Sequence, residues 1–186
     1  MILPIVAFGS PVLRERSVDI NPDYPNLEML LENMRETMSE AHGVGLAAPQ
    51  INKSIRLFLI NTAPFLDDEE ATEEKIVEQV FINARMLQET GEEWSFNEGC
   101  LSIPNLREDI SRRSTITIEY FDENFKKHID TYDGLTARVI QHEYDHIDGI
   151  LFTDRISVLR KRMIKGKLLD ISKGKVDVSY KMRFYR

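Results

Sequence analysis

The stretch GLTARVIQHEYDHIDG, residues 134–149, predicts a helix that Gly149 can end. Asp133, just before it, is available as the N-cap. Positions i, i+4, i+7 and i+11 of this helix share one face, which makes the two histidines part of an apolar stripe. We therefore expect the helix to be buried with its histidines facing inward. The stripe consists of Leu135, Val139, His142 and His146.

The flanking sequence predicts both helices and strands. Apolar residues at helical spacing indicate a helix over 26–42, and a last helix is expected over 157–171. Short apolar runs at 55–60 and 80–82 are typical of buried strands, and alternation predicts a hairpin formed by 115–120 and 125–132 and a terminal strand at 176–180. The expected fold is α+β, with strands surrounding the buried helix 134–146.

Composition predicts one domain over residues 1–186. The chain has 186 residues, is 42% hydrophobic and shows no repeat, which fits a single globular domain. One cysteine cannot form an internal disulfide, so we expect a reducing, cytoplasmic setting. No run approaches the ~20 apolar residues of a membrane span, and none is expected to enter a membrane.

Charge is distributed unevenly along the chain. The net charge of −7 argues against a general DNA or RNA binder, because phosphate backbones attract positive charge. Residues 155–186, however, carry a local +9 against −16 for residues 1–154. This basic helix and tail fits either an anionic partner or a solvated helix face. The acidic run at 67–75 is expected to be an exposed loop insertion.

Residues 142–146 form the motif H-E-x-x-H. On a helix, His142 and His146 lie one turn apart, where both rings can bind one metal ion, and Glu143 is placed to handle the proton of a metal-bound water. A catalytic site usually has three protein ligands. The third ligand is left open by the spacing, with Cys100, His42, His128 or a carboxylate as candidates.

Two further segments combine with this motif. GVGLAAPQ at 43–50 holds small residues before a polar amide, and EGCLSIP at 98–104 carries the only cysteine. Together with QHEYDHIDG at 141–149, in this order and spacing, they resemble the three motifs of peptide deformylases. The resemblance is close from Gly43 to Phe152.

This resemblance implies a metal-dependent hydrolysis of N-formylmethionyl peptides that releases formate. Its implied metal ligands are Cys100, His142 and His146, and its implied proton-transfer group is Glu143. It implies one divalent ion per chain: Fe(II) first, Zn(II) second, with nickel or cobalt as substitutes. The implied donors to the developing oxyanion are the Gln50 amide and the backbone N–H of Leu101.

The expected substrate site joins the first two motifs to the helix. The peptide is expected to add as an extended strand against Val44 and Gly45 and the strand that follows Cys100, and a side chain at Gly45 would obstruct it. Arg138, four residues before His142, departs from the family's apolar residue and is expected either to reach the rim or to meet a carboxylate such as Glu98. Arg107 and Glu98 are expected to pair near the site. Residues expected to bind substrate are Val44, Gly45, Glu98, Gly99, Leu135 and Val139.

The expected partners are formylated nascent chains and, through the basic segment 155–186, ribosomal RNA. Two readings from other classes compete with this one. A fold retained only for peptide binding is disfavoured by the intact Glu143, Gln50 and ligand set, and a closed structural zinc site would need a fourth protein ligand. The strongest enzymatic rival is a metallopeptidase, which uses H-E-x-x-H with a different third ligand.

Substitution of Cys100 separates the deformylase from the metallopeptidase. We expect Cys100→Ala to lose the bound metal, because one of three ligands disappears, and elemental analysis of the purified variant measures this. Full metal occupancy in the variant would favour the metallopeptidase.

Overall fold

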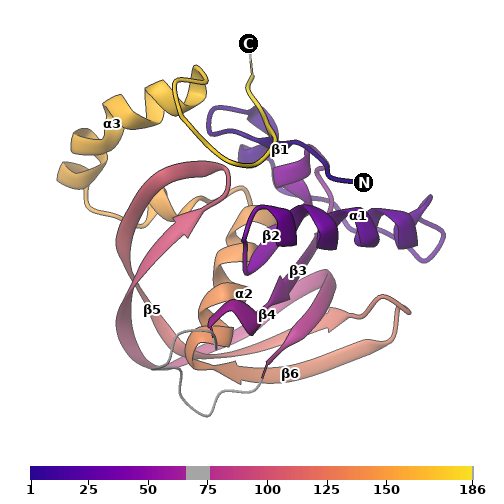
Figure 1. The fold of residues 1–186 in the computed structure, drawn as a ribbon. Coiled ribbons are helices and arrows are strands. Elements are labelled where there is room, and N and C mark those ends of the chain that lie inside the picture. Colours follow the sequence, from indigo (N-terminus) through magenta and orange to yellow (C-terminus); the bar gives the residue numbers. More distant parts are fainter. Residues whose placement is uncertain (66–75, 186) are drawn as a thin grey trace.

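The computed structural model describes residues 1–65 and 76–185, so the loop expected at 67–75 falls outside the described residues. Its main sheet has five antiparallel strands in the order β2-β3-β4-β5-β6, and a second, parallel sheet pairs β1 with β7 (Figure 1). The strands are β1 (Ile5–Val6), β2 (Gly45–Ala47), β3 (Leu57–Asn61), β4 (Glu78–Cys100), β5 (Ile103–Phe121), β6 (Lys127–Asp133) and β7 (Met182–Arg183).

In the part of the chain that the structure describes, three α-helices accompany the sheets, close to the ranges expected from the sequence. They are α1 (Leu27–Glu40), α2 (Gly134–Ile147) and α3 (Val158–Ser172), and short 3₁₀ turns cover Pro11–Arg14, Ala48–Ile51, Ala63–Phe65 and Phe152–Asp154. The Ser157 hydroxyl caps α3 by accepting a hydrogen bond from the backbone N–H of Arg160. Within the described residues, no helix is both long enough and apolar enough to cross a membrane.

The H-E-x-x-H helix α2 lies inside the curve of the main sheet, as expected. It contacts β2, β3, β5 and β6, and ten of its 14 residues are buried (Figure 1). Ala137, Val139, Ile140 and Ile147 pack in one cluster with the stacked rings of Phe58 and Phe81. The α+β arrangement of strands around a buried helix is therefore confirmed.

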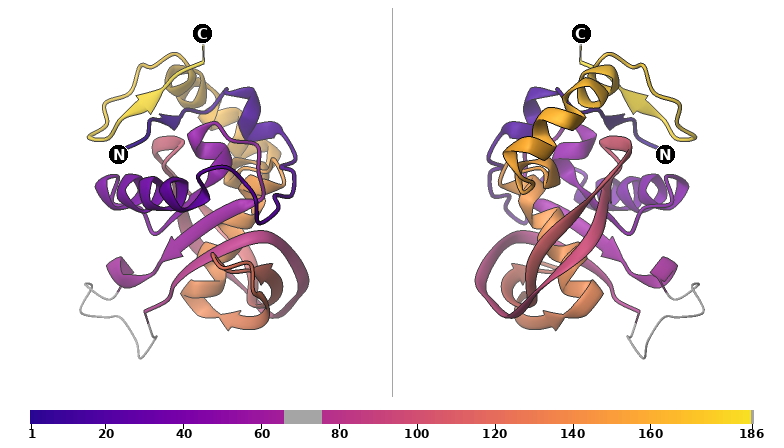
Figure 2. Two further views of the ribbon diagram at one scale, coloured as in Figure 1. Left: turned by 90° about the vertical axis from the view of Figure 1, so that its right-hand side faces the viewer. Right: turned by 90° about the vertical axis from the view of Figure 1, so that its left-hand side faces the viewer.

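The hairpin β4–β5 is far longer than the sequence predicts. Residues 88–93 are polar or glycine and are exposed, so they lack the apolar alternation that reveals a strand. They are nevertheless paired with β5, and the register shifts at several points along the pair. Such bulges bend and twist a hairpin, and here the hairpin arches past α2 (Figure 2).

The terminal strand expected at 176–180 is wrong in position. The strand that forms is β7, where Met182 lies opposite Ile5 of β1. The apolar alternation at 176–180 has another cause, because Val176 packs against a core cluster while Val178 lines a cavity. Apolar alternation indicates only that one side of a segment is buried. The segment forms a strand only where the edge of another strand is available for pairing.

Candidate metal centre

Three side chains converge where the end of β4 meets α2. The Cys100 sulfur and one ring nitrogen each of His142 and His146 lie within 4.8 Å of one another, and Cys100 Sγ is 3.2 Å from His146 Nε2. His128 instead pairs with Asp122, its Nε2 2.8 Å from a carboxylate oxygen. Of the candidates that the sequence left open for the third ligand, the fold brings Cys100 to the two histidines.

This cluster has the chemistry of a divalent-metal site. Glu98 accepts a hydrogen bond from His142 Nδ1 at 3.0 Å, which leaves Nε2 with its lone pair for a metal. The buried Nδ1 of His146 has no hydrogen-bond partner among the described residues. One sulfur and two imidazole nitrogens are a donor set that suits first-row divalent ions.

Burial and neighbouring groups shift the pKa values of His142 and His146 in opposite directions. Burial lowers the pKa of His146 well below its usual value, and the nearby His142 adds to the effect. Burial also opposes a charged His142, but hydrogen bonds to Cys100 and Glu98 outweigh it and raise the pKa of His142. A metal and a proton therefore compete for His142.

Glu143 is buried beside the cluster. Its Oε2 has no hydrogen-bond partner among the described residues, and burial raises the pKa of Glu143 to about 7. Gly45 makes room for this carboxylate: a Cβ there would lie 2.7 Å from Glu143 Cδ and overlap Oε1. The structure thus gives a further reason for glycine at position 45, which is the space that the Glu143 carboxylate occupies.

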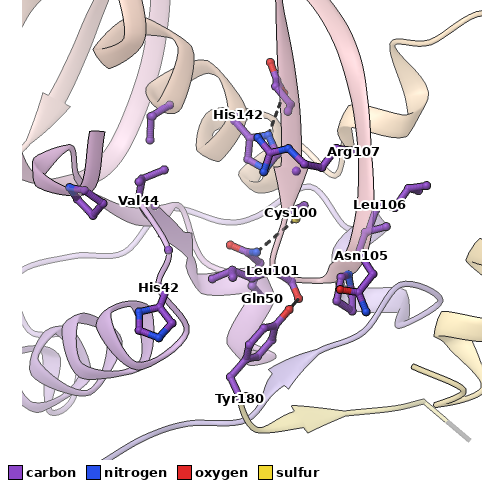
Figure 3. A pocket seen from close by; sticks show the side chains of 18 of the residues that line it. His42, Val44, Gln50, Cys100, Leu101, Asn105, Leu106, Arg107, His142 and Tyr180 are labelled. Carbon is purple, nitrogen blue, oxygen red and sulfur yellow. Dashed lines mark hydrogen bonds and ion pairs between the residues drawn. The ribbon is translucent and has the colours of Figure 1, made fainter. Parts of the chain in front are cut away.

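Gln50 points its amide nitrogen toward the cysteine. The backbone N–H of Ala47 donates to Gln50 Oε1 at 2.8 Å, which orients Nε2 to within 3.6 Å of Cys100 Sγ. The same Nε2 lies 3.4 Å from Ser102 Oγ. Leu101 and Ser102 form the turn between β4 and β5, because Cys100 is paired with Ile103 across it. Gln50 and the backbone of Leu101 therefore lie on the same side of the centre (Figure 3).

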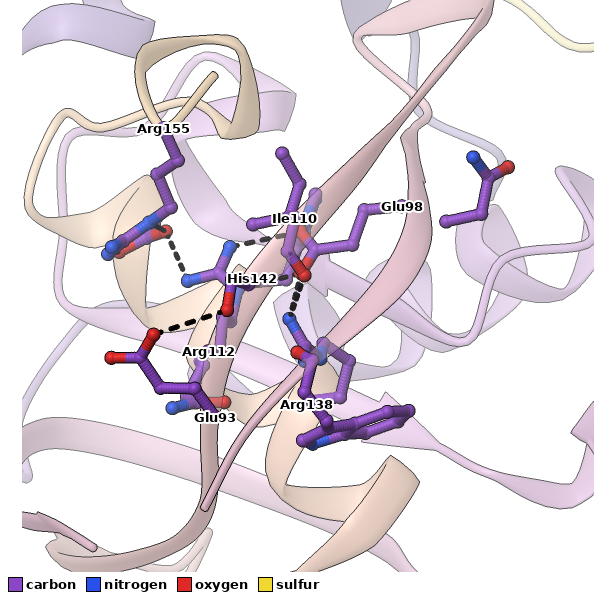
Figure 4. A network of polar contacts seen from close by, with 12 residues as sticks. Glu93, Glu98, Ile110, Arg112, Arg138, His142 and Arg155 are labelled. Carbon is purple, nitrogen blue, oxygen red and sulfur yellow. Dashed lines mark hydrogen bonds and ion pairs between the residues drawn. The ribbon is translucent and has the colours of Figure 1, made fainter. Parts of the chain in front are cut away.

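A buried network of ion pairs surrounds Glu98, the carboxylate that binds His142 (Figure 4). Arg112 binds Glu98 through two hydrogen bonds of 2.7 and 2.9 Å and reaches Asp145 at 2.8 Å. Arg155 approaches the same Asp145 at 2.6 Å. Burial would raise the pKa of Glu98, but hydrogen bonds from His142 and Arg112 hold it well below its usual value. Glu98 is thus a permanent carboxylate. Sequence reasoning missed Arg112, which sits on a strand with no motif around it.

The unusual Arg138 meets Glu98 and does not reach the rim. It is only 2% exposed, and its Nη1 donates to Glu98 Oε1 at 3.0 Å and to the Ile110 carbonyl at 2.9 Å. Its guanidinium lies over the Trp94 ring, 4.5 Å from the ring centre. The pairing expected between Arg107 and Glu98 is wrong, because Arg107 binds Asn97 at 3.0 Å and Glu98 is already enclosed by other cations.

The centre opens into a cavity of about 630 Å³ (Figure 3). Five of the six residues expected to bind substrate line it: Val44, Gly45, Glu98, Gly99 and Val139. Leu135, half-buried in the first turn of α2, is outside this lining set. The sequence did not indicate three further groups of lining residues, which are Pro64 with Phe65 and Phe96, Asn105 with Leu106, and residues 177–180.

A buried H-E-x-x-H helix with a third ligand from a strand and a cavity at its face defines a metallohydrolase. A family model for polypeptide deformylase matches residues 2–162. The chain belongs to the peptide deformylase family, whose enzymes remove the N-formyl group from nascent polypeptides.

The chain is similar in sequence to individual peptide deformylases over nearly its whole length. The chain is 61% identical to the peptide deformylase of Christiangramia forsetii, covering 99% of this chain and 96% of the relative, and 57% identical to that of Flavobacterium johnsoniae, with the same coverage. A crystal structure of peptide deformylase from Plasmodium falciparum superposes with a TM-score of 0.80 at 34% identity, over 91% of this chain and 95% of that one. One from Legionella pneumophila also gives 0.80, at 32% identity, over 94% and 98%.

Arg112 is expected to be essential to stability. Arg112→Met leaves the buried carboxylates of Glu98 and Asp145 short of a partner, so the free energy of unfolding should fall by about 3–5 kcal/mol in chemical denaturation. Its neighbour Arg113 is 49% exposed and lies 3.7 Å from Glu93, which makes Arg113→Met a matched control. The control should change stability by less than about 0.5 kcal/mol. Equal effects of the two substitutions would contradict this account.

Proposed function

We propose that the enzyme hydrolyses the formyl group of N-formylmethionyl peptides in this cavity, with Glu143 as the group that transfers protons. The observation that carries the proposal is the position of Glu143: a buried carboxylate with one unpartnered oxygen, next to a Cys/His/His cluster. A proton-transfer group works best when its pKa lies near the working pH, and burial moves Glu143 in that direction. A cation held by the cluster opposes this shift, since positive charge favours the carboxylate.

Cys100, His142 and His146 would hold the ion. We propose Fe(II) first and Zn(II) second, with nickel or cobalt as substitutes; the thiolate and imidazole donors are compatible with each of them. When bound, the ion supplies Lewis acidity, which lowers the pKa of a coordinated water and polarises a carbonyl oxygen.

The chain's own groups then perform the following steps. Glu143 accepts the proton of the attacking water and returns it to the nitrogen as the bond between formyl carbon and nitrogen breaks, giving formate and a free amino terminus. The Gln50 amide and the backbone N–H of Leu101 donate to the oxygen that gains charge. Because Gln50 Oε1 is held by Ala47, its nitrogen is oriented before substrate arrives.

We propose that the formylmethionine side chain occupies the apolar part of the cavity, with the peptide extended along residues 44–45. Val44, Val139 and the aliphatic part of Glu98 offer apolar surface there, and Gly99 lies beside them. The sequence also predicts Leu135 in this pocket, but Leu135 does not line the cavity, which argues for a supporting role. The buried Arg138 bounds the same region through its contact with Glu98.

Glu143→Gln tests the proposed reaction. The amide keeps the shape of the side chain but cannot accept the proton, so kcat for formate release from a formyl-Met-Ala-Ser peptide should fall by about 10²- to 10⁴-fold. Protein purified without oxygen should contain as much metal as the wild type. An unformylated peptide is the control substrate. Undiminished formate release by the variant, or peptide-bond cleavage by the wild type, would contradict the proposal.

We also propose that α3 contacts ribosomal RNA. Arg162, Lys165 and Lys167 are exposed along this helix, and a basic helix is attracted to phosphate backbones. Simple removal of residues 155–186 is a poor test, since Arg155 belongs to the buried ion network and Ile164 to a core cluster.

A charge reversal on α3 is the cleaner experiment. The triple substitution Arg162→Glu, Lys165→Glu and Lys167→Glu should weaken cosedimentation with ribosomes, and added salt should weaken the wild type in the same way. The matched control reverses three exposed charges elsewhere: Arg16→Glu, Lys53→Glu and Lys126→Glu. Binding that is unaffected by the α3 substitutions, or insensitive to salt, would exclude this contact.

A further inference from the structure

The segment that follows α3 returns to the active-site cavity. Asp177, Val178, Ser179 and Tyr180 line the cavity that also contains Cys100. The match to the family model ends at residue 162, so this segment lies beyond the matched part of the chain. Figure 3 shows Tyr180 beside Leu101, at the turn between β4 and β5.

Backbone contacts hold the segment on both sides of Tyr180. Before it, the Asn105 side chain donates to the carbonyl of Asp177 at 2.9 Å. After it, the backbone N–H of Ile5 donates to the Lys181 carbonyl at 2.9 Å, at the start of the β1–β7 pairing. The position of the segment is therefore fixed without the tyrosine hydroxyl.

The hydroxyl of Tyr180 makes a different contact. It donates a hydrogen bond of 2.7 Å to the backbone carbonyl of Leu101. The next carbonyl, of Ser102, accepts from the N–H of Phe8 at 2.8 Å. Both carbonyls of this two-residue turn are thus held from outside the hairpin, by residues near the two ends of the chain. The tyrosine ring also packs against the same core cluster as the Leu101 side chain.

We propose that Tyr180 is a positioning residue for the reaction, which fixes the Leu101 backbone so that its N–H points at the developing oxyanion. This inference rests on the proposed function, which assigns that N–H its role. A turn residue has two soft dihedral angles, and its N–H keeps a fixed direction only when neighbouring groups are restrained. A donor stabilises new charge most when it needs no reorientation during the reaction.

Tyr180→Phe tests the inference because it removes only the oxygen. The kcat for formate release from formyl-Met-Ala-Ser should fall about threefold to tenfold, as expected for loss of one hydrogen bond that acts in the transition state. KM, metal content and melting temperature should stay close to wild type. Tyr185, 64% exposed on the same segment, supplies the control Tyr185→Phe, which should leave kcat unchanged.

A second measurement observes the Leu101 N–H without using activity. The chain contains one cysteine, so Cys100–Leu101 is its only Cys–Leu peptide bond. Labelling cysteine carbonyls with ¹³C and leucine amides with ¹⁵N therefore selects a single NMR signal. Tyr180→Phe should shift this signal and speed its hydrogen exchange, whereas Tyr185→Phe should do neither.

The outcomes separate the possible failures. Unchanged kcat and an unchanged Leu101 signal in Tyr180→Phe would overturn the inference. A rise in KM at constant kcat would also overturn the inference and would mean that Tyr180 only contacts bound substrate. A fall in kcat accompanied by loss of metal or a lower melting temperature would overturn it as well, and would mean that Tyr180 only stabilises the fold. If the wild type itself releases no formate, the proposed function fails, while the NMR comparison still reports whether Tyr180 restrains Leu101.

Discussion

The carboxylate of Glu98 joins the two parts of the molecule that make the metal centre. It comes from β4, two residues before Cys100, and it binds His142 of α2 at 3.0 Å. The fold thereby ties the strand that supplies the sulfur ligand to the helix that supplies both imidazoles. Hydrogen bonds from His142 and Arg112 favour the charged form of this carboxylate, and the buried Arg138 also donates to it.

Burying this network of ion pairs costs free energy, and its function is to orient the ring of His142. Taking several charges out of water costs energy that their mutual attraction offsets only when the geometry is good. Here Glu98 receives hydrogen bonds from three cations or imidazoles, and Asp145 is shared by Arg112 and Arg155. An apolar cluster could fill the same space, but it could not fix the ring of His142 in the orientation that leaves its second nitrogen for a metal.

Segments near both ends of the chain meet at the same centre. The turn at Leu101 and Ser102 is held by Phe8 from the N-terminal segment and by Tyr180 from the C-terminal one. Gly45 leaves the space in which the Glu143 carboxylate sits. The centre therefore depends on three chain segments, those of Phe8, Gly45 and Tyr180, that pack around α2 and the end of β4.

The sequence alone determined the buried helix, the α+β class and the residues of the centre. Helical spacing places His142 and His146 on one inward face whatever surrounds them, and three motifs in fixed order single out Cys100 and Gln50. The helical pattern follows from backbone periodicity, which a single sequence displays, whereas the roles of Cys100 and Gln50 are implied by the resemblance of the three motifs to those of peptide deformylases.

Only the tertiary structure decided the rest. The polar half of the hairpin, the partners of Glu98, the reason for Gly45 and the strand at 182–183 all depend on contacts between residues far apart in the chain. The sequence predicts Arg107 as the partner of Glu98, whereas the structure gives Arg112. Pairing between β4 and β5 directs Arg112 inward and leaves Arg107 beside Asn97, because side chains alternate between the two faces of a strand and bulges shift that alternation.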